Sequence, residues 1–350
     1  MKISIAILGA GPPLPWKDIA TFVQEAERLG VDYAWSAEAW TRDAVVPLAY
    51  LAARTERIRL GTGILAAGAR SPGLTAMTAT TLAEVSEGRF CLGIGASGPQ
   101  VIEGVHGFAF EGQLARIRET VEIVRQAATG EPLSYEGQYY AVPRRDGPEP
   151  RKALRVGQPI PQPVPIYVGA MSPAGLRLTG EVADGWLGHH FIPEASEVFF
   201  APLREGARKA GRALADLDLQ AGSWVEFGDD LDALVASRRP YLAFNLGAMG
   251  SASKNYYNEV YVRAGFPEEA REAQRLWLAG DRAAAAAVVP DEMVLQSQLI
   301  GPEARIRERI ALYRELGIDV LRVAPAGDTL DAQLETLGRV VDLVRDVSGP

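Results

Sequence analysis

Short apolar runs alternate with amphipathic segments along the whole chain. The runs are mostly apolar on both faces, as in buried parallel strands, and they fall at 3–8, 33–36, 58–64, 90–94, 166–168, 185–187, 217–225 and 320–324. Between them, apolar residues recur at helical spacing, for example over 15–29, over 113–128 and in a last helix that carries Leu330 and Val344. This alternation of eight strands with helices predicts a (β/α)8 TIM barrel in preference to an open doubly wound sheet.

Three of the predicted helices end in a glycine. Gly30, Gly88 and Gly317 each stand between an amphipathic segment and a predicted strand. Glycine readily adopts the left-handed conformation with which many helices end. We therefore expect these three glycines to have positive φ and to turn the chain into the next strand.

Two segments interrupt the alternation. Residues 130–165 hold eight of the 23 prolines, so this stretch is not expected to be helical and is predicted to be an insertion before the fifth strand. Residues 245–254 are rich in glycine, alanine and serine, and two further helices are predicted after them, near 267–279 and 282–289. Loops that follow the strands build the active site of a barrel, so this second segment is predicted to be a lid. The alternative is a surface excursion without function.

Composition and charge fit one barrel domain over 1–350, with insertions near 130–165 and 245–300. The chain is 47% hydrophobic and 23% charged, as in soluble globular proteins. Its net charge of −8 argues against a basic surface for nucleic acid. A single cysteine, Cys91, excludes an internal disulfide and suits the cytoplasm, and no apolar run is long enough to span a membrane. We expect a cytoplasmic protein that binds a small molecule and neither nucleic acid nor a membrane.

Glycine-rich turns follow three of the predicted strands. Residues 93–98 read G-x-G-x-x-G, but they follow the fourth strand, and the residues beyond them are helical where a dinucleotide-binding fold has a second strand that ends in an acidic residue, so that fold is rejected. Small residues nevertheless let a ligand approach the backbone, and the helix after Pro99 could hold a phosphate. A similar turn spans 169–173, and Gly61 and Gly63 interrupt the third strand. Alternatively, these glycines only allow tight turns between strands and helices and bind no ligand.

Several titratable side chains follow predicted strands and are candidate general acids or bases. They are Glu38 after the second strand, Glu103 and His106 after the fourth, and His189 and His190 after the sixth. Three histidines without metal-ligand spacing, and no H-E-x-x-H or EF-hand motif, predict no metal. The sequence also lacks a G-x-S-x-G elbow and a Walker lysine motif, so neither a hydrolase nor a nucleotide kinase is favoured.

Several sequence blocks resemble the luciferase-like monooxygenase superfamily. The carriers are residues 55–64, residues 88–95 and, above all, residues 96–104, with further matches at 183–186, 254–258 and 300–302. The Ser-Gly-Pro-Gln stretch within 96–104 favours the branch that uses the deazaflavin coenzyme F420 and includes methylenetetrahydromethanopterin reductase. The resemblance covers nearly the whole chain.

The resemblance implies a cofactor site and a reaction. A non-proline cis peptide is expected at Gly63–Ile64, supporting one face of the ring. The segments Ala96, Ser97, Gly98 and Ala170, Met171, Ser172 are expected to line the side chain and phosphate of the cofactor. The implied reaction moves a hydride between C5 of the deazaflavin and a small organic substrate. The resemblance also implies a homodimer.

One departure from the family concerns the acid or base. Relatives have an Asp-His pair after the second strand, where this chain has Ala37-Glu38 followed by Trp40. Either Glu38 substitutes for the imidazole or the reaction needs no base there. From their strand-end positions, Glu38, Trp40 and His189 are predicted as catalytic residues. The alternatives are an FMN-dependent monooxygenase of the same superfamily and a non-catalytic ligand-binding barrel.

Overall fold

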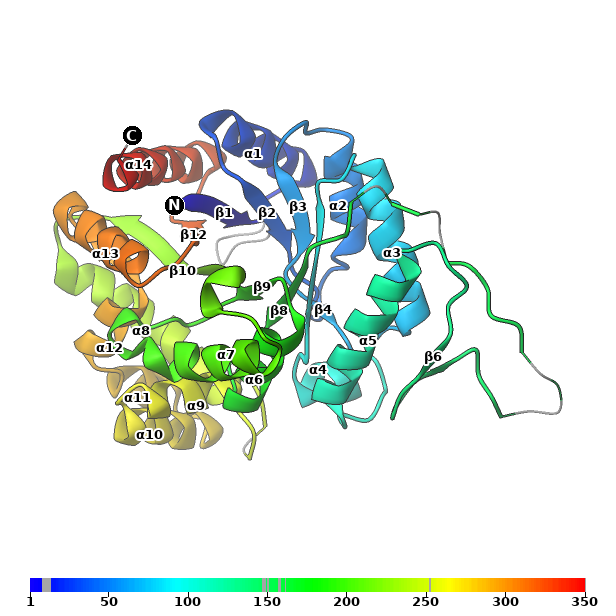
Figure 1. Ribbon diagram of the computed structural model, residues 1–350. Coiled ribbons are helices and arrows are strands. Elements are labelled where there is room, and N and C mark those ends of the chain that lie inside the picture. The colour runs from blue at the N-terminus through cyan, green and yellow to red at the C-terminus, as the bar shows by residue number, and fades with distance from the viewer. Residues whose placement is uncertain are drawn as a thin grey trace.

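Eight parallel strands close into a barrel in the computed structural model, which describes residues 1–7, 14–146, 149, 151–156, 159–160, 162–251 and 253–349 (Figure 1). In ring order the strands are β1 (Lys2–Ala6), β2 (Tyr33–Ser36), β3 (Arg59–Thr62), β5 (Phe90–Gly95), β8 (Ile166–Gly169), β9 (Gly185–Leu187), β10 (Asp218–Phe227) and β12 (Val320–Pro325). Pairing of β12 with β1 and of β9 with β10 completes the ring. The predicted TIM barrel is confirmed.

Each predicted run supplies one strand of the ring, but two details differ. The run expected at 58–64 ends at Thr62, and the short strand β4 (Leu65–Ala66) then pairs farther along β5. A further strand, β11 (Leu299–Gly301), pairs with the end of β10 and was not predicted. Leu8, the expected last residue of the first strand, lies outside the described residues.

Alternation along the strands separates two cores. Inward-facing side chains fill the barrel as one cluster, which comprises Tyr33, Trp35, Cys91, Tyr167, Leu187 and Val320. Outward-facing neighbours such as Ala34, Leu92 and Leu321 pack in the larger core between the strands and the surrounding helices. Both faces of the strands are therefore apolar, which is why the strands read as continuous apolar runs.

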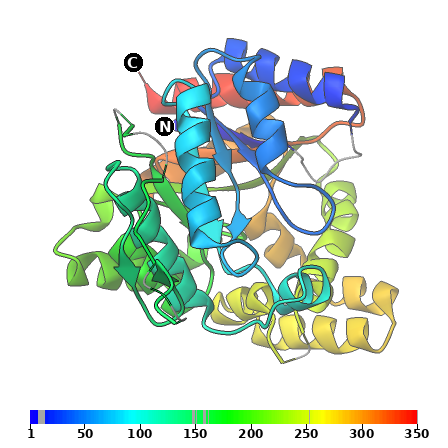
Figure 2. The same cartoon turned by 90° about the vertical axis from the view of Figure 1, so that its right-hand side faces the viewer.

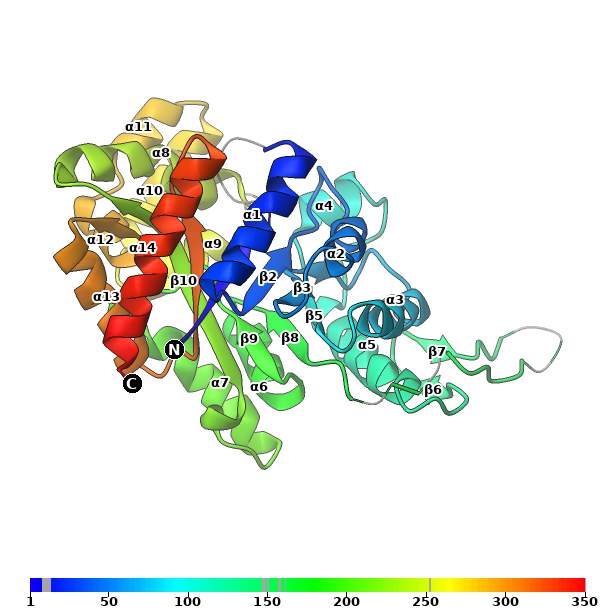
Figure 3. The ribbon, with the colours of Figure 1, turned by 90° about the horizontal axis from the view of Figure 1, so that it is seen from above.

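A layer of helices surrounds the barrel (Figures 2 and 3). They are α1 (Trp16–Leu29), α2 (Val45–Ala52), α3 (Pro72–Val85), α4 (Pro99–Gly104), α5 (Gln113–Ala127), α6 (Pro173–Val182), α7 (Glu197–Lys209), α13 (Glu303–Glu315) and α14 (Leu330–Ser348). The three predicted glycine turns are confirmed, because Gly30, Gly88 and Gly317 have φ of 94°, 83° and 85°. They connect α1, α3 and α13 to the strands that follow.

The segment between α5 and β8 projects from the barrel (Figures 1 and 3). Its described residues contain no helix and form an antiparallel pair, β6 (Tyr135–Glu136) and β7 (Ala141–Val142). Glu119 of α5 is buried and accepts hydrogen bonds from the backbone N–H groups of residues 138, 139 and 140. This carboxylate ties the tip of the hairpin to the helix layer.

A cluster of helices lies between β10 and β11 and has a core of its own. It comprises α8 (Leu231–Ala248), α9 (Tyr256–Arg263), α10 (Pro267–Leu278), α11 (Arg282–Ala287) and α12 (Asp291–Ser297). The glycine-rich segment expected at 245–254 begins inside α8, so residues 245–248 are helical and not loop. The Asn255 amide, at the start of α9, donates to the carbonyl oxygens of Asn245 and Leu246 at 3.1 and 2.8 Å. This pair of bonds holds α9 against the end of α8.

Candidate functional site

The predicted site residues come together at the carboxyl ends of the barrel strands. Glu38 follows β2, Ile64 follows β3, residues 96–98 follow β5, residues 170–172 follow β8 and His189 follows β9. Because the strands are parallel, these ends form a single rim, which is where barrel enzymes carry their active sites. Residues 8–13, which come after β1 in the sequence, lie outside the described residues.

The peptide between Gly63 and Ile64 is cis, as the family resemblance implies. Hydrogen bonds join this bulge to the end of β2 on both sides. The Gly63 N–H donates to the Ser36 carbonyl at 2.7 Å, and the Glu38 N–H donates to the Ile64 carbonyl at 3.4 Å. Glu38 is thus fixed beside the bulge through its own backbone.

Glycines of the neighbouring strands make room for two large side chains at the rim. A Cβ on Gly61 would lie 2.2 Å from the Trp35 ring inside the barrel, and a Cβ on Gly95 or on Gly169 would lie 2.9 Å from the Ile64 side chain. These three glycines are therefore required by packing. Gly98 differs, since a Cβ there would meet nothing within 4 Å. Only Gly98 among these four borders open space that a ligand can approach.

Two of the three non-glycine residues with positive φ in the described chain lie at this rim. They are Ser97, with φ of 57°, and His190, with φ of 51°. The left-handed region is uncommon for residues with a Cβ, and such residues often occur at functional sites. Ser97 is also partly exposed.

The turn after β8 leads into α6. The Ser172 hydroxyl accepts a hydrogen bond from the Gly175 N–H at 3.2 Å and so caps the helix. The Met171 carbonyl accepts from Arg263 of α9 at 2.7 Å. A capped helix N-terminus without an acidic residue in its first turn, with a guanidinium beside it, forms a positive environment at this corner.

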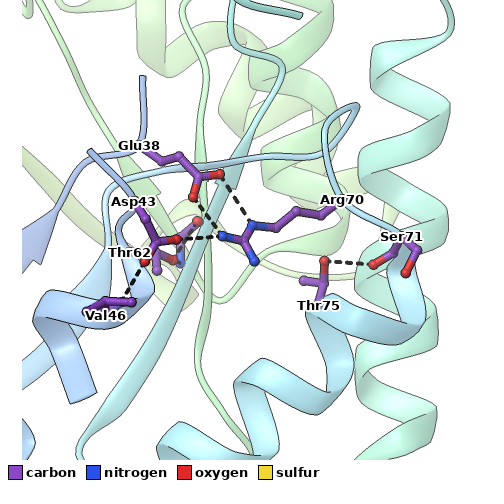
Figure 4. A network of polar contacts seen from close by, with 8 residues as sticks. Glu38, Asp43, Val46, Thr62, Arg70, Ser71 and Thr75 are labelled. Carbon is purple, nitrogen blue, oxygen red and sulfur yellow. Dashed lines mark hydrogen bonds and ion pairs between the residues drawn. The ribbon is translucent and has the colours of Figure 1, made fainter. Parts of the chain in front are cut away.

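Glu38 is engaged in a buried ion-pair network (Figure 4). Its two carboxylate oxygens accept from Arg70 Nε at 3.3 Å and Nη2 at 2.8 Å, and the glutamate side chain is 8% exposed. Arg70 Nη2 also donates to Asp43 at 2.8 Å, while Asp43 accepts from the Val46 N–H at the start of α2. The hydrogen bonds to Glu38 raise the pKa of Arg70 above its ordinary value. The network joins the β2–α2 and β4–α3 connections.

The two adjacent histidines occupy different environments. The His189 side chain is exposed to solvent, although dense protein surrounds it. The pKa of its imidazole is well below the ordinary value, and the largest cause is desolvation by the surrounding protein. Electrostatic interactions with His190 and Arg322 lower the pKa further. His190 is buried, with Nδ1 2.8 Å from the Tyr261 hydroxyl and its ring stacked on Tyr241. Burial lowers the pKa of His190 to about 4. Both rings are therefore neutral near pH 7.

We expect His190 to make the protein sensitive to acid. Between pH 6.5 and about 4 the unfolded chain binds a proton at this position that the folded chain does not, so stability falls as the pH drops through this window. The loss at pH 4.5 relative to pH 7 is roughly 2–3 kcal/mol for a shift of this size. Urea unfolding of the wild type and of His190→Phe at both pH values measures it. The two proteins showing the same pH dependence would disprove the assignment.

The remaining predicted residues lie apart from this network. Trp40 is 54% exposed and lies farther along the β2–α2 connection. Glu103 and His106 belong to α4 and the loop after it, and the Glu103 carboxylate accepts from the Phe110 N–H at 3.0 Å. That bond organises the loop and leaves these two residues without a described contact to Glu38 or His189. Trp40, Glu38 and His189 remain predictions as catalytic residues.

Sequence reasoning missed two cations at the rim. Arg70 forms the ion pair described above, and Arg322 lies on β12 with its Nη1 donating to the Gly188 carbonyl at 2.9 Å. An arginine in the otherwise apolar run 320–325 was the available signal for the second one. Nothing in the sequence pairs Arg70 with Glu38, which lies 32 positions earlier.

Two clefts in the described part of the chain lie away from the rim. One of about 1110 Å³ is bounded by α5, the β6–β7 hairpin, α6 and α7. The other, of about 660 Å³, opens at the opposite end of the barrel beside Tyr33 and Asp218. Neither is lined by a predicted site residue. The described residues also contain no group of three or more potential metal ligands and no helix with the length and apolarity of a membrane span.

Comparisons with known proteins agree with the sequence motifs. The profile of the family described as luciferase-like monooxygenase matches residues 1–320. A protein of Mycobacterium tuberculosis, provisionally named a coenzyme F420-dependent oxidoreductase, is 36% identical over 329 residues, which are 92% of this chain and 94% of that protein. The 5,10-methylenetetrahydromethanopterin reductase of Archaeoglobus fulgidus is 30% identical over 348 residues, which are 97% of this chain and 98% of that protein.

A solved structure shares the fold. The coenzyme F420-dependent tetrahydromethanopterin reductase of Methanopyrus kandleri superposes with a TM-score of 0.79 at 24% identity, over 98% of both chains. The chain belongs to the luciferase-like monooxygenase family, as its motifs predict, and is an oxidoreductase of that family.

Proposed function

We propose that the protein is a coenzyme F420-dependent oxidoreductase that moves a hydride between C5 of the deazaflavin and a small organic substrate. The name of the Mycobacterium tuberculosis relative, whose alignment covers 92% of this chain, supports the cofactor. The structural observation that carries the proposal is that residues 63–64 and the turns 96–98 and 170–172 follow the neighbouring strands β3, β5 and β8 at one rim of the barrel. When bound, the deazaflavin would supply the carbon that accepts or gives the hydride.

The proposed cofactor-binding residues form two groups. One group would contact the ring of the deazaflavin, and the other would contact its side chain and phosphate. Gly63 and Ile64 would lie against one face of the ring. Ala96, Ser97 and Gly98 would contact the side chain and phosphate, and this is consistent with the open space at Gly98 and the partial exposure of Ser97. Ala170, Met171 and Ser172 would hold the same anion from the α6 corner, where the helix terminus and Arg263 provide positive potential.

The proposed substrate side is formed by Glu38, Trp40 and His189. Glu38 is an oriented carboxylate because its backbone is fixed to Ile64 and its side chain to Arg70. In that position it would accept or return the proton that accompanies hydride transfer, in place of the histidine of relatives. His189, neutral and exposed, would position the substrate by hydrogen bonding. Trp40 would supply an apolar surface.

Titration of the purified protein with F420 tests the proposal. We expect a dissociation constant in the micromolar range, about 1–10 µM, and weaker binding of FMN under the same conditions. Gly98→Val fills the open space at the turn and should weaken F420 binding at least roughly tenfold, since one lost contact of about 1.4 kcal/mol has this effect. Gly73→Val is the matched control, because Gly73 also has nothing within 4 Å but lies in α3.

The rival functions give different results in the same experiments. Tight binding of FMN together with oxygen consumption in an oxygen electrode would identify a flavin monooxygenase instead. Failure to bind either cofactor would overturn the proposed redox activity and favour a barrel that only binds ligands.

A further inference from the structure

Arg322 points into the barrel from β12, close to the rim. On this strand Leu321 and Val323 belong to the outer core, whereas Val320 belongs to the inner cluster. Side chains alternate along a strand, so Arg322 faces inward, two residues closer to the carboxyl end than Val320. Its hydrogen bond to the carbonyl of Gly188, the residue after β9, shows that the guanidinium extends past β10 toward the end of β9.

The Arg322 guanidinium has no anionic partner in the described part of the chain. Among the described residues its one hydrogen bond is the 2.9 Å contact to the neutral Gly188 carbonyl, and no carboxylate of that part of the chain forms an ion pair with it. None of the residues outside the described ranges has a carboxylate side chain. Burial lowers the pKa of Arg322 to about 10, so the group still carries its charge near pH 7.

The surroundings leave the guanidinium accessible from the rim. Arg322 is only partly buried, and the neighbouring position on β10 is Gly222, where a Cβ would lie 1.9 Å from the Arg322 carbonyl oxygen. β10 therefore places no side chain at this level. The exposed His189 follows Gly188, and the Arg322 charge contributes to the lowered pKa of its imidazole, so the two groups lie near each other. At the rim, the Arg322 guanidinium offers charged hydrogen-bond donors and the neutral His189 imidazole offers one N–H donor.

A partly buried cation without a counter-ion among the described residues is unfavourable. Removing such a charge from water costs several kcal/mol unless a partner compensates it, and an apolar side chain of similar volume is usually better tolerated in a core. A guanidinium that has spare N–H groups and faces the rim is suited to bind the planar oxygens of a carboxylate or the oxygens of a phosphate. The missing partner is then supplied by a ligand.

We propose that Arg322, with His189 beside it, binds an oxyanionic group of the small substrate, a carboxylate or a phosphate. This inference rests on the proposed function only in taking the rim to be the active site. It assigns the substrate to the class of organic anions and gives β12 a specificity-determining residue. The same chemistry can come from the phosphate of the cofactor, and the experiment separates the two sources.

Calorimetric titration with sodium acetate and with inorganic phosphate tests the inference on the protein alone and on the protein saturated with F420. We expect at least one of the two anions to bind with a dissociation constant of about 1–10 mM. Arg322→Met should weaken this binding roughly ten- to a hundredfold, and Arg322→Lys should retain part of it, since an ammonium keeps the charge but not the planar fork. Anion binding that persists with F420 bound identifies a substrate group, whereas competition with F420 identifies the cofactor phosphate and overturns the proposal.

Arg305→Met is the matched control. Arg305 of α13 also donates to a single backbone carbonyl, that of Leu295 at 3.2 Å, and burial also lowers its pKa. We expect this variant to bind the anion as the wild type does. Equal binding by Arg322→Met and the wild type, or binding of neither anion at concentrations of about 10 mM, would overturn the inference. Both results leave the measured affinity for F420, and thus the proposed function, unaffected.

Thermal unfolding without any anion distinguishes a ligand-binding role from a structural one. If the role of Arg322 is to bind a ligand, Arg322→Met should unfold at the same or a higher temperature than the wild type, because the substitution removes an uncompensated charge. If the bond to Gly188 is the reason for the arginine, the variant should unfold at a lower temperature. A clear decrease together with unchanged anion binding would assign Arg322 to the barrel wall only.

Discussion

Gly93→Ala is expected to lower the free energy of unfolding by about 3 kcal/mol, at the upper end of the usual range for an overpacked core position. Gly93 lies in the fully buried strand β5, and a Cβ there would lie 1.8 Å from the Thr62 carbonyl oxygen of β3. The obstacle is backbone, which cannot rotate away. The Thr62 hydroxyl also accepts from the Gly93 N–H at 2.9 Å and donates to the Gly93 carbonyl at 2.8 Å, so separating the strands breaks both bonds.

Urea denaturation of the wild type and of Gly93→Ala measures the difference in the free energy of unfolding. Gly73→Ala is the control. Gly73 lies in α3 with nothing within 4 Å of the position a Cβ would occupy, so alanine should stabilise the helix or change the stability by less than about 1 kcal/mol. A loss below about 1 kcal/mol for Gly93→Ala would mean that β3 and β5 can move apart at no great cost. The bulge at Gly63–Ile64 would then rest on a less rigid wall than the packing indicates.

The barrel could be predicted because its strands are buried on both faces. Apolar runs such as 90–94 and 320–324 result from two cores meeting at each strand, and the sequence displays that requirement directly. β11, Leu299–Gly301, was not predicted because it directly follows the last helix of the cluster, α12, so the sequence does not set it apart from that helix. The early end of β3 was not predicted because no breaking residue separates Thr62 from Ile64 except Gly63, and a glycine inside a run does not mark where the strand ends.

The site could be predicted only as far as strand order determines it. Parallel strands bring their carboxyl ends to one rim, so Glu38, Ser97 and His189 were expected at the same end of the barrel, and they are there. The partner of Glu38 was not predictable, because the ion pair depends on how the β4–α3 connection folds back over β2. The sequence also could not show that Arg322 has no carboxylate partner among the described residues. Which side chains lie near Arg322 depends on how the barrel closes and not on the run 320–325.

Arg70→Met is expected to lower the free energy of unfolding by about 3 kcal/mol at pH 7, at the lower end of the range for breaking a buried ion pair. The variant leaves the Glu38 carboxylate, whose side chain is 8% exposed, without the guanidinium that contacts both of its oxygens. It also removes the partner of Asp43, although that side chain is 39% exposed and contributes less. Arg125→Met is the control, because the Arg125–Asp184 pair has a similar 2.9 Å contact but both side chains are more than two-fifths exposed. The control should change stability by less than about 1 kcal/mol.

A double-mutant cycle with Glu38→Gln separates the cost of an unpaired charge from the cost of lost packing. If the unpaired carboxylate is the cause, the Glu38→Gln, Arg70→Met double variant should be more stable than Arg70→Met alone, with a coupling energy of roughly 1–3 kcal/mol. If the two losses simply add, the ion pair contributes little and Arg70 acts through its hydrocarbon stem. In that case the ion pair with Arg70 does not fix the orientation of the Glu38 carboxylate. The proposed proton transfer, which depends on that orientation, would then lose its support.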